Sequence, residues 1–293
     1  MSIKGYVLGV TDCSYAGFPH RFENGMSMFY LLSNGEFLIY DGGQGKEDGD
    51  HLYSQLRRVA DDNGIKDITV SAWIITHEHG DHMGFGKEFF PAYHDKINVR
   101  ELWMNSLYDW GKSFIKNLLQ YQPNCIHRQL RTGEIIQIGD VTVEVLCTPD
   151  VLEKINAVEL NNDSNNASIV TRLNVDGLKI LMPGDASLLA WKYMTDTYGN
   201  ALKSDILQVP HHGANHGATV EAYRLVNADT LIFNCGQELF DSIVSEEKLF
   251  VCSPECQHQL FNKHVFEYLQ EFKGNIIIAG AYFPPKCQCE RFL

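Results

Sequence analysis

The segment Thr76–Gly84 reads THEHGDHMG and places four side chains that can bind a metal within six residues. These side chains are His77, His79, Asp81 and His82. The segment follows the apolar run Ile68–Thr76, which predicts a buried strand. A polar loop with surface histidines is the alternative interpretation, but so dense a cluster after an apolar strand favours a metal site.

The spacing within the cluster indicates room for two ions. Side chains two residues apart in an extended chain point the same way, so His77 and His79 can bind one ion together. Gly80 lets the backbone turn, and Asp81 and His82 can then face a second ion. Imidazole nitrogen and carboxylate oxygen suit zinc and other borderline first-row metals. We therefore expect one or two Zn²⁺ ions, with Mn²⁺ or Fe as alternatives.

Strand-like and helical segments alternate on both sides of the cluster. Met28–Ile39 predicts two strands around an Asn-Gly turn, and Ser106–Tyr121 predicts a helix with Leu107 and Trp110 on its apolar face. Such a mixture indicates sheets covered by helices. Phe89–Tyr93, just after the metal loop, is a candidate wall of a substrate pocket. The tryptophans are expected in the core: Trp73, Trp103, Trp110 and Trp191.

The composition is that of a globular protein with an acidic surplus. The 293 residues are 44% hydrophobic and 21% charged, and the formal net charge is −13. This apolar content argues against disorder as the main state. The negative charge argues against long nucleic acids as partners, because phosphate backbones are bound by clustered Lys and Arg. A small phosphorylated substrate is compatible with it, since a metal ion can supply the local positive charge.

The termini and cysteines favour a cytoplasmic protein. The first residues, MSIKGYVLGVTDCSYAG, contain no long apolar stretch typical of a secretory signal. No apolar run reaches the roughly 18 residues needed to span a bilayer, so no membrane partner is expected. The eight cysteines could form four disulfides, but that framework is typical of short secreted chains. The oligomeric state cannot be inferred from these features.

Four motifs in order along the chain carry a family resemblance. His77-x-His79-x-Asp81-His82 resembles the HxHxDH signature of the metallo-β-lactamase superfamily. The other three are FLIYDGG (Phe37–Gly43), ILMPGDAS (Ile180–Ser187) and DILQVPHHGA (Asp205–Ala214). The resemblance implies an α+β fold, a four-layer αββα sandwich with a metal centre at one edge of the paired sheets. We expect residues 1–293 to form a single domain of this type.

The resemblance also implies a set of site residues. The metal ligands would be His77, His79, Asp81, His82, Asp185 and His212, with His211 as the alternative to His212. Asp185 would bridge two metals, and Asp41 would support the metal loop. The family pattern favours His212 because it stands immediately before a glycine. His211 would then orient a ligand or donate a hydrogen bond to the substrate.

The chain departs from the family between Asp150 and Ala167. Superfamily hydrolases usually have a Gly-His-Thr segment there, whose histidine completes the first metal position, but this span contains no histidine. An oxygen ligand could come from Asp163, Asn165 or Asn166, or from a water. The position of His77, His79 and Asp185 would then bind its ion more weakly, and occupancy by one ion is an alternative. The loop residue His216 is a candidate for substrate contact.

Finer features point to a branch of the family. The stretches Val143–Pro149 and Asn161–Leu173, together with VPHHG, resemble the competence-type ComEC branch, and phosphorylcholine esterases share a similar arrangement. We therefore expect metal-activated water to hydrolyse a phosphodiester or other small phosphoester. The catalytic residues would be Asp81, His211 and His212. The alternatives are a non-catalytic metal-binding or sensor module, or a hydrolase of a thioester or other carboxylic ester.

Three other interpretations are less favoured. Diiron flavoprotein relatives in the superfamily have a glutamate where His79 stands, which argues against redox chemistry. True β-lactamases are exported, and this chain shows no signal. A structural zinc site could use the C-terminal residues Cys252, Cys256, His258, Cys287 and Cys289. Their spacings differ from the usual C-x2-C pairs, so ordinary cysteines are expected.

Overall fold

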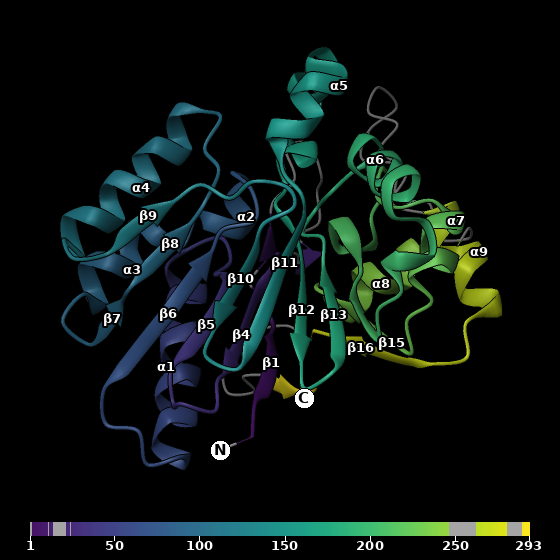
Figure 1. Cartoon of the computed structure of the whole chain (residues 1–293). Helices are drawn as coiled ribbons and strands as arrows, with labels where there is room; N and C mark the ends of the chain where they lie inside the picture. Colours follow the sequence, from purple (N-terminus) through teal and green to yellow (C-terminus); the bar gives the residue numbers. More distant parts are fainter. Residues whose placement is uncertain (1, 11, 14–21, 24, 246–261, 280–288) are drawn as a thin grey trace.

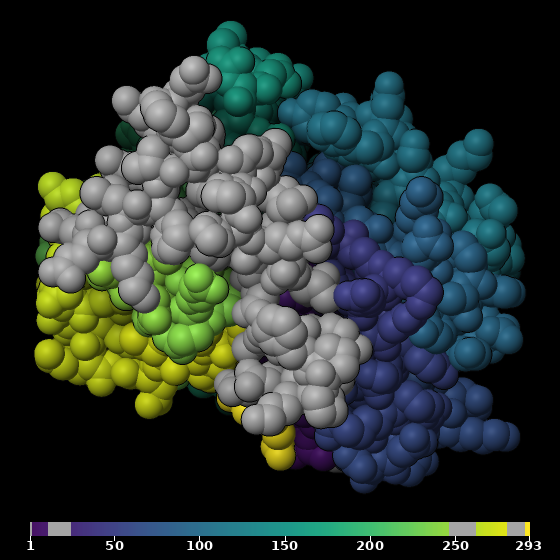
Figure 2. All heavy atoms as spheres, turned by 180° about the vertical axis from the view of Figure 1, so that it is seen from behind, coloured from purple at the N-terminus to yellow at the C-terminus, as the bar shows by residue number. Residues whose placement is uncertain are grey.

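Two β-sheets face each other, and helices cover the outer face of each (Figure 1). The computed structural model describes residues 2–10, 12–13, 22–23, 25–245, 262–279 and 289–293. The α+β layered sandwich predicted from the sequence is confirmed. Figure 2 shows the molecule from behind, with the purple-to-blue first half and the green-to-yellow second half on opposite sides.

The first sheet comes mainly from the N-terminal half of the chain. Its strand order is β17-β1-β4-β5-β6-β8-β9, with β7 also paired to β6. The strands β4 and β5 form the hairpin around the predicted Asn-Gly turn, and β5 runs parallel to β6. Their bounds are β1 (Lys4–Leu8), β4 (Ser27–Leu31), β5 (Phe37–Asp41), β6 (Ile68–Ile74), β7 (Ile97–Val99), β8 (Glu101–Trp103), β9 (Ile126–Arg128) and β17 (Cys289–Arg291).

The second sheet has the order β10-β11-β12-β13-β14-β15-β16. Its first four strands pair antiparallel, and β13 to β16 pair parallel. The bounds are β10 (Ile135–Ile138), β11 (Val141–Cys147), β12 (Val170–Val175), β13 (Leu178–Met182), β14 (Ile206–Gln208), β15 (Thr230–Phe233) and β16 (Asn275–Ile278). A short pair, β2 (Asp12–Cys13) and β3 (Phe22–Glu23), stands apart from both sheets.

The helices divide between the two outer layers (Figure 1). The first sheet is covered by α1 (Lys46–Asp62), α3 (Gly86–Tyr93) and α4 (Asp109–Tyr121), and the metal loop continues into α2 (Gly80–Met83). The second is covered by α6 (Leu188–Tyr198), α7 (Val220–Val226), α8 (Gln237–Ile243) and α9 (Lys263–Glu271). The helix α5 (Pro149–Asn162) projects from one end of the molecule. Short 3-10 helices are η1 (Ser164–Ala167), η2 (Gly199–Leu202) and η3 (Pro210–Gly213).

Three apolar clusters account for these layers. The central cluster joins residues of both sheets, such as Tyr40 and Ile74 from the first and Leu173 and Ile180 from the second. The other two lie between each sheet and its own helices. Burial of apolar surface on both faces of both sheets is the main stabilising contribution to this arrangement.

Two sequence predictions about aromatic residues were wrong. Trp73, Trp103 and Trp191 are buried as expected, but Trp110 is 55% exposed, and Leu107 beside it is 40% exposed. Trp110 stands in the first turn of α4 and Leu107 two residues before the helix, and among the described residues no element covers this apolar side. Phe89 and Phe90 do not line a pocket, because their rings pack against Trp73 in the core, with centroids 5.3 and 5.8 Å away.

Two further points concern the C-terminal cysteines and membrane spans. The cysteine site proposed for the C-terminus, Cys252, Cys256, His258, Cys287 and Cys289, lies outside the residues whose side chains are described. In the part of the chain that the structure describes, no helix combines the length and apolarity required to cross a bilayer.

Candidate metal centre

The predicted site residues come from loops at the carboxyl ends of four strands. Asp41 ends β5, the segment from His77 to His82 follows β6, Asp185 follows β13, and His212 follows β14 within η3. The strands β5 and β6 are parallel neighbours, as are β13 and β14. Parallel neighbours end at the same edge of a sheet, so two loops of each sheet are brought together there.

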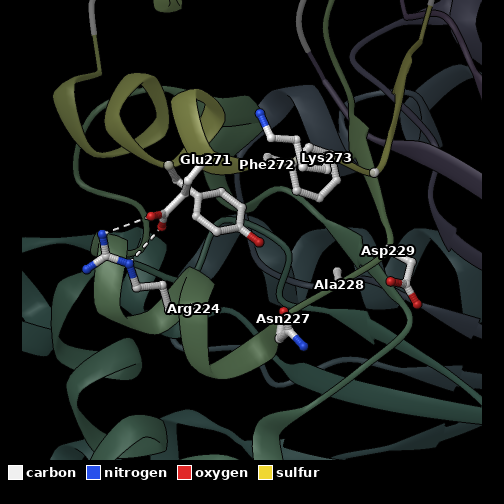
Figure 3. Close-up of a pocket in the computed structure, with 9 residues that line it drawn as sticks. Arg224, Asn227, Ala228, Asp229, Glu271, Phe272 and Lys273 are labelled. Carbon is white, nitrogen blue, oxygen red and sulfur yellow. Dashed lines mark hydrogen bonds and ion pairs between the residues drawn. The ribbon is translucent and has the colours of Figure 1, made fainter.

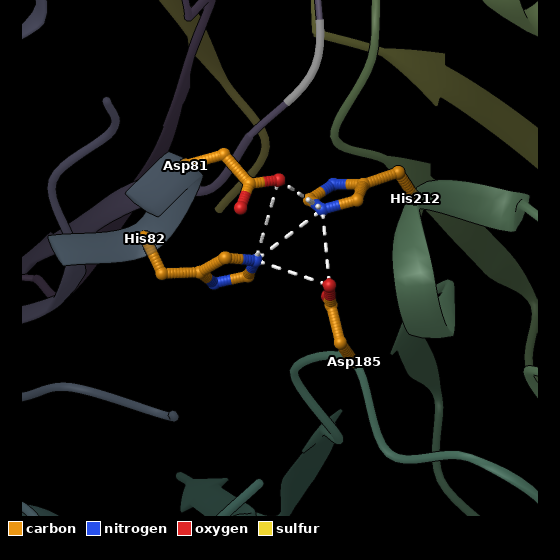
Figure 4. Close-up of side chains that lie close together, drawn as sticks. All are labelled: Asp81, His82, Asp185 and His212. Atoms are coloured by element: carbon orange, nitrogen blue, oxygen red, sulfur yellow. Dashed lines mark hydrogen bonds and ion pairs between the residues drawn. The ribbon is translucent and has the colours of Figure 1, made fainter. Parts of the chain in front are cut away.

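One group of ligand atoms joins Asp81, His82, Asp185 and His212 (Figure 4). The Nε2 atom of His212 lies 3.3 Å from Oδ2 of Asp81 and 3.3 Å from Oδ2 of Asp185. The Nε2 atom of His82 lies 3.2 Å from the same Asp185 oxygen and 3.3 Å from Nε2 of His212. Four ligand atoms therefore surround one small volume, as expected for a four-coordinate ion.

A second group of ligand atoms shares a member with the first. It consists of His77, His79 and Asp185, with all ligand atoms within 4.8 Å of one another. The Nε2 atom of His77 lies 3.7 Å from Oδ2 of Asp185. The two groups meet at Asp185, whose two oxygens would allow one carboxylate to contact ions in both positions.

The outward nitrogens of the buried histidines are held by hydrogen bonds. The Nδ1–H of His82 donates to Asp41 Oδ2 at 2.7 Å, and that of His212 donates to the carbonyl oxygen of Asn234 at 2.9 Å. Nδ1 of His77 lies 3.2 Å from Oγ1 of Thr76. Donation from Nδ1 leaves a lone pair on Nε2, the atom that faces the group of ligands. With Nδ1 held in this way, Nε2 is the nitrogen that becomes available to a metal once its proton leaves.

Asp41 connects the first sheet to the metal loop. Its carboxylate accepts the backbone N–H and the hydroxyl of Thr76 at 2.7 and 2.8 Å, besides the His82 ring. Asp41 is fully buried and has a left-handed backbone, with φ of 52°. A non-glycine residue in that region costs about 1–3 kcal/mol, and such strain is concentrated at functional sites. The predicted supporting position of Asp41 agrees with these contacts.

The electrostatics of the cluster show where positive charge is required. Burial lowers the pKa of His212, but the carboxylates of Asp185 and Asp81 outweigh it and raise that pKa to about 9. Burial likewise opposes a charge on His82, yet Asp185 and Asp41 raise its pKa well above the usual range. In contrast, burial holds the pKa of His77 well below its usual range. The two protons on His82 and His212 balance the buried carboxylates, and a divalent cation can replace them.

Two backbone features allow the loops to meet. Gly184 has φ of 57°, and a Cβ there would lie 2.8 Å from the Cβ of Thr76, so only glycine lets Asp185 approach the metal loop. His211 and His212 both have left-handed backbones, with φ of 51° and 56°. This tight turn directs the two neighbouring rings to different surroundings.

The structure separates the remaining predicted residues. His212 joins the cluster, whereas His211 stands at its rim with Nδ1 donating to the carbonyl of Asn215 at 2.7 Å and Nε2 3.4 Å from Nδ2 of Asn165. Asp163 and Asn166 accept hydrogen bonds from backbone and hydroxyl donors, and Asp163 belongs to neither group of ligand atoms. His216 is exposed and belongs to neither group of ligand atoms.

Sequence reasoning missed several residues that shape this site. Thr76 bridges Asp41 and two histidine rings, although it stands in the quoted segment. Ser164 Oγ lies 2.5 Å from Nε2 of His79. Glu78 is buried and accepts the backbone N–H of Leu107 and Tyr108 and the Trp110 indole N–H, which joins the metal loop to the start of α4. The available signal was the presence of hydroxyl-bearing and acidic residues in Thr76–Gly84 and in the span from Asp150 to Ala167.

A separate hollow of about 550 Å³ lies between α7 and α9 (Figure 3). Its polar lining includes Arg224, Asp229, Glu271 and Lys273. The Arg224 guanidinium is paired with the Glu271 carboxylate at 2.7 Å, so its positive charge is largely neutralised. The hollow contains none of the predicted site residues.

The residues of the cluster fit a metal. Nε2 of His77 and Oδ1 of Asp185 are buried and have no hydrogen-bond partner among the described residues. Buried polar atoms without partners are costly, and a cation would satisfy both. Imidazole and carboxylate donors suit borderline divalent ions such as zinc, and the same donors occur around manganese and iron.

The fold and this ligand set define the class of protein. The family model of the metallo-beta-lactamase superfamily matches residues 23–234, which is more than half of the chain. The chain therefore belongs to the metallo-β-lactamase superfamily, as the four sequence motifs predicted.

Individual relatives place the chain within this family. Over 236 residues it is 23% identical to ComE operon protein 3 of Bacillus subtilis (strain 168), covering 78% of this chain and 28% of that protein. This agrees with the ComEC-like resemblance of the motifs. The chain spans about a quarter of the length of the curated relatives that it matches.

Solved structures share the fold. The metallo-beta-lactamase fold protein YhfI from Bacillus subtilis has a TM-score of 0.55 and 16% identity, covering 97% of this chain and 99% of its own. CmlA, a diiron β-hydroxylase from Streptomyces venezuelae, has a TM-score of 0.55 and 10% identity, covering 99% of this chain and 54% of its own. At such identities the similarity shows the fold alone.

Proposed function

We propose that this chain is a metal-dependent hydrolase that acts on a phosphodiester or other small phosphoester. The observation that carries the proposal is the pair of ligand groups that share Asp185. Two ions held by a shared carboxylate form the arrangement used in two-metal hydrolysis. One or two Zn²⁺ ions are the proposed cofactor, with Mn²⁺ or Fe as alternatives, because the same donors accept all three.

His77, His79 and Asp185 would hold one ion, and Asp81, His82, Asp185 and His212 the other. Bound divalent ions supply Lewis acidity and lower the pKa of a coordinated water toward neutrality. The protein residues supply geometry and proton transfer. Hydrogen bonds from the outward ring nitrogens keep the lone pairs of His82 and His212 directed at the ion.

Asp81 is the ligand best placed to act on the nucleophile. Its side chain is 13% exposed, whereas those of His82 and Asp185 are almost fully buried. A carboxylate at the open side of the site can accept a hydrogen bond from the attacking water and orient it, with a part in proton transfer. Its backbone oxygen accepts the N–H of Met26 at 3.1 Å, which fixes the start of α2.

His211 is the proposed proton donor to the leaving group. Its Nδ1–H is held by the Asn215 carbonyl, so its half-buried ring presents Nε2 toward Asn165 at the rim. With Nδ1 donating, Nε2 is the accepting nitrogen and faces the Nδ2–H of Asn165, so a proton taken up at Nε2 from the attacking water can be passed on to a departing oxygen. His212 would act through the metal that it binds, and His216 is a further candidate for substrate contact.

The proposed substrate is a small molecule. A net charge of −13 opposes the approach of a long polyanion, but the buried cluster supplies metal-borne positive charge over a short distance. The resemblance of the sequence motifs to the ComEC-like branch and to phosphorylcholine esterases supports a phosphoester over a thioester or other carboxylic ester. We also propose that residues 1–293 act as one domain in the cytoplasm.

A non-catalytic metal-binding or sensor module is the second candidate. It is favoured by the group around His77, which has only three His or Asp ligands among the described residues. A poorly occupied first position would bind an ion without activating water for attack.

The test is a hydrolysis assay on the metal-loaded full chain. The chelator-treated protein is reloaded with Zn²⁺, Mn²⁺ or Fe²⁺ and given bis-nitrophenyl phosphate, a nitrophenyl monoester, a thioester and a carboxylic ester. Asp81→Ala is compared with Asp196→Ala, an exposed carboxylate on α6 that pairs with Lys192. We expect Asp81→Ala to lose activity and Asp196→Ala to keep it. Equal phosphodiester rates in the two variants would refute the proposal, and metal binding without turnover would favour the sensor.

A further inference from the structure

One histidine of the two ligand groups is held the opposite way round from the others. The three that have Nδ1 engaged in a hydrogen bond are His77, His82 and His212. In His79, Nε2 is the engaged nitrogen, 2.5 Å from Oγ of Ser164, and Nδ1 has no hydrogen-bond partner among the described residues. A ring nitrogen occupied by a hydrogen bond is not available to an ion, so Nδ1 is the nitrogen of His79 that is left for one.

The backbone of His79 is fixed, but this does not fix the orientation of its ring. The carbonyl oxygen of His79 accepts the N–H groups of His82 and Met83 at 3.2 and 3.1 Å, at the start of α2. The ring can still turn about the Cβ–Cγ bond. A half-turn would exchange Nδ1 with Cδ2 and Nε2 with Cε1, so it would break the hydrogen bond to Ser164 and turn Nδ1 away. Among the described residues, this hydrogen bond is the contact that can select one orientation.

The hydroxyl of Ser164 is itself held by the elements around it. Oδ1 of Asp163 accepts a backbone N–H within η1 at 3.1 Å, and its Oδ2 accepts the hydroxyl of Ser187 at 2.5 Å. Oδ1 of the buried Asn166 accepts the backbone N–H of Ala190 at 3.2 Å. These bonds anchor η1 to the start of α6. The helical layer of the second sheet therefore sets the place of a hydroxyl that meets a histidine of the first.

We propose that Ser164 is a positioning residue: its hydroxyl oxygen accepts the Nε2–H of His79 and so keeps Nδ1 directed at the first metal position. The inference deepens the proposed function and rests on its metal centre. Ser164 acts through His79 and contacts no ion itself. Because His82 and His212 have other partners, loss of this hydroxyl should weaken the first position and leave the second unchanged.

The direct test determines which nitrogen of His79 carries the proton. The full chain is labelled with ¹⁵N-histidine, and long-range ¹H–¹⁵N correlation spectra distinguish a proton on Nδ1 from one on Nε2. The signals of His79 are assigned by comparison with His79→Gln. Spectra are recorded in chelator and after loading with Zn²⁺. We expect the proton on Nε2 in both states, a result that simple packing of Ser164 against the ring would not produce.

Three variants connect the tautomer to metal affinity. Ser164→Ala removes the hydroxyl and Ser164→Thr keeps it. Ser113→Ala is the matched control, because this serine donates to the Asp109 carbonyl within its own helix, α4. Each chelator-treated protein is titrated with Zn²⁺ by calorimetry. In Ser164→Ala we expect the first position to lose about 10–100-fold in affinity and His79 to lose its single tautomer. Ser164→Thr and Ser113→Ala should match wild type in both measurements.

Three results would overturn the inference. The first is a wild-type His79 with its proton on Nδ1. The second is a folded Ser164→Ala protein with wild-type tautomer and affinities, and the third is a folded Ser164→Thr protein with the tautomer of Ser164→Ala. If Ser164→Ala does not fold, or the wild-type chain takes up a single ion, the wild-type tautomer in chelator decides. Failure of the proposed function is distinguishable, since it would appear as absent hydrolysis while the tautomer is as expected.

Discussion

Asp41→Asn is the sharpest perturbation of the metal loop, because it keeps the shape of the side chain and changes only its hydrogen-bonding capacity. The carboxylate accepts three donors: the N–H of Thr76 on Oδ1, and the hydroxyl of Thr76 and the ring of His82 on Oδ2. An amide has one accepting oxygen and one NH₂ donor. One of the buried N–H groups must therefore face another donor.

The two orientations of the amide have different consequences. With its oxygen toward the Thr76 N–H, the NH₂ group faces Nδ1 of His82. That ring must then move its proton to Nε2, the atom that lies 3.2 Å from Asp185 and would bind the metal. Loss of such a supporting hydrogen bond typically costs 10–100-fold in metal affinity, which is about 1.4–2.7 kcal/mol.

In the other orientation the amide oxygen serves His82, and the backbone N–H of Thr76 is left without an acceptor at the end of β6. A buried unsatisfied donor costs about 1–3 kcal/mol of folding stability. The change must therefore appear in metal affinity, in the free energy of unfolding, or in both.

The assay measures both quantities on the same protein. Zn²⁺ affinity is obtained by competition with a chromophoric chelator, and the free energy of unfolding by urea denaturation in the presence of a strong chelator. Asp196→Asn is the control, an exposed carboxylate expected to stay within about 0.5 kcal/mol of wild type. If Asp41→Asn matched this control in affinity and in stability, the assigned support of the His82 tautomer would be wrong.

Three further predictions follow from the same contacts. Gly184→Ala places a methyl group 2.8 Å from the Cβ of Thr76 at a φ of 57°, so we expect a loss of about 1–3 kcal/mol by urea unfolding and weaker Zn²⁺ binding; unchanged values would show that the loops can separate freely. Glu78→Gln removes one acceptor from the start of α4, and we expect about 1–2 kcal/mol lower stability and altered tryptophan emission from the released Trp110 indole, whereas a wild-type emission spectrum would contradict this. In the presence of a chelator, the pKa of His212 is about 9 in the folded protein against about 6.5 in the unfolded chain. The stability that this difference contributes is full below about pH 6.5 and is lost as the pH rises through about 9. Zn²⁺-loaded protein should not show that loss, and parallel curves of stability against pH with and without Zn²⁺ would count against the metal replacing the proton.

Much of the site was predictable because several of its ligands lie close together in the sequence. The His77 and His79 side chains share a side of an extended segment, and Asp81 and His82 follow a turn at Gly80, so these two pairs required only short-range geometry, whereas Asp185 and His212 were implied by the family resemblance. The hairpin that ends in Asp41 carried an Asn-Gly turn, whose backbone preference is equally local.

The failures share a different cause. Trp110 follows the helical periodicity of core residues and yet is 55% exposed, whereas Phe89 and Phe90 were expected beside a pocket because they follow the metal loop, and both are buried. Periodicity identifies an apolar face of a helix but does not show which part of that face another element covers. Only the positions of α3 and α4 against the first sheet decide this.

The sequence by itself determined the family, the layered fold and the types of ligand, because these depend on residue identity, spacing and apolar patterning. The tertiary structure decided the choices between neighbours. His211 and His212 are adjacent and chemically identical, and only their left-handed backbone turn and the acceptor at Asn234 direct one ring into the cluster and the other to its rim. Ser164 likewise stands among several polar residues, and it meets His79 only because η1 of one sheet packs across the metal loop of the other. Contacts between residues 85 positions apart are set by the packing of whole layers, which no local pattern contains.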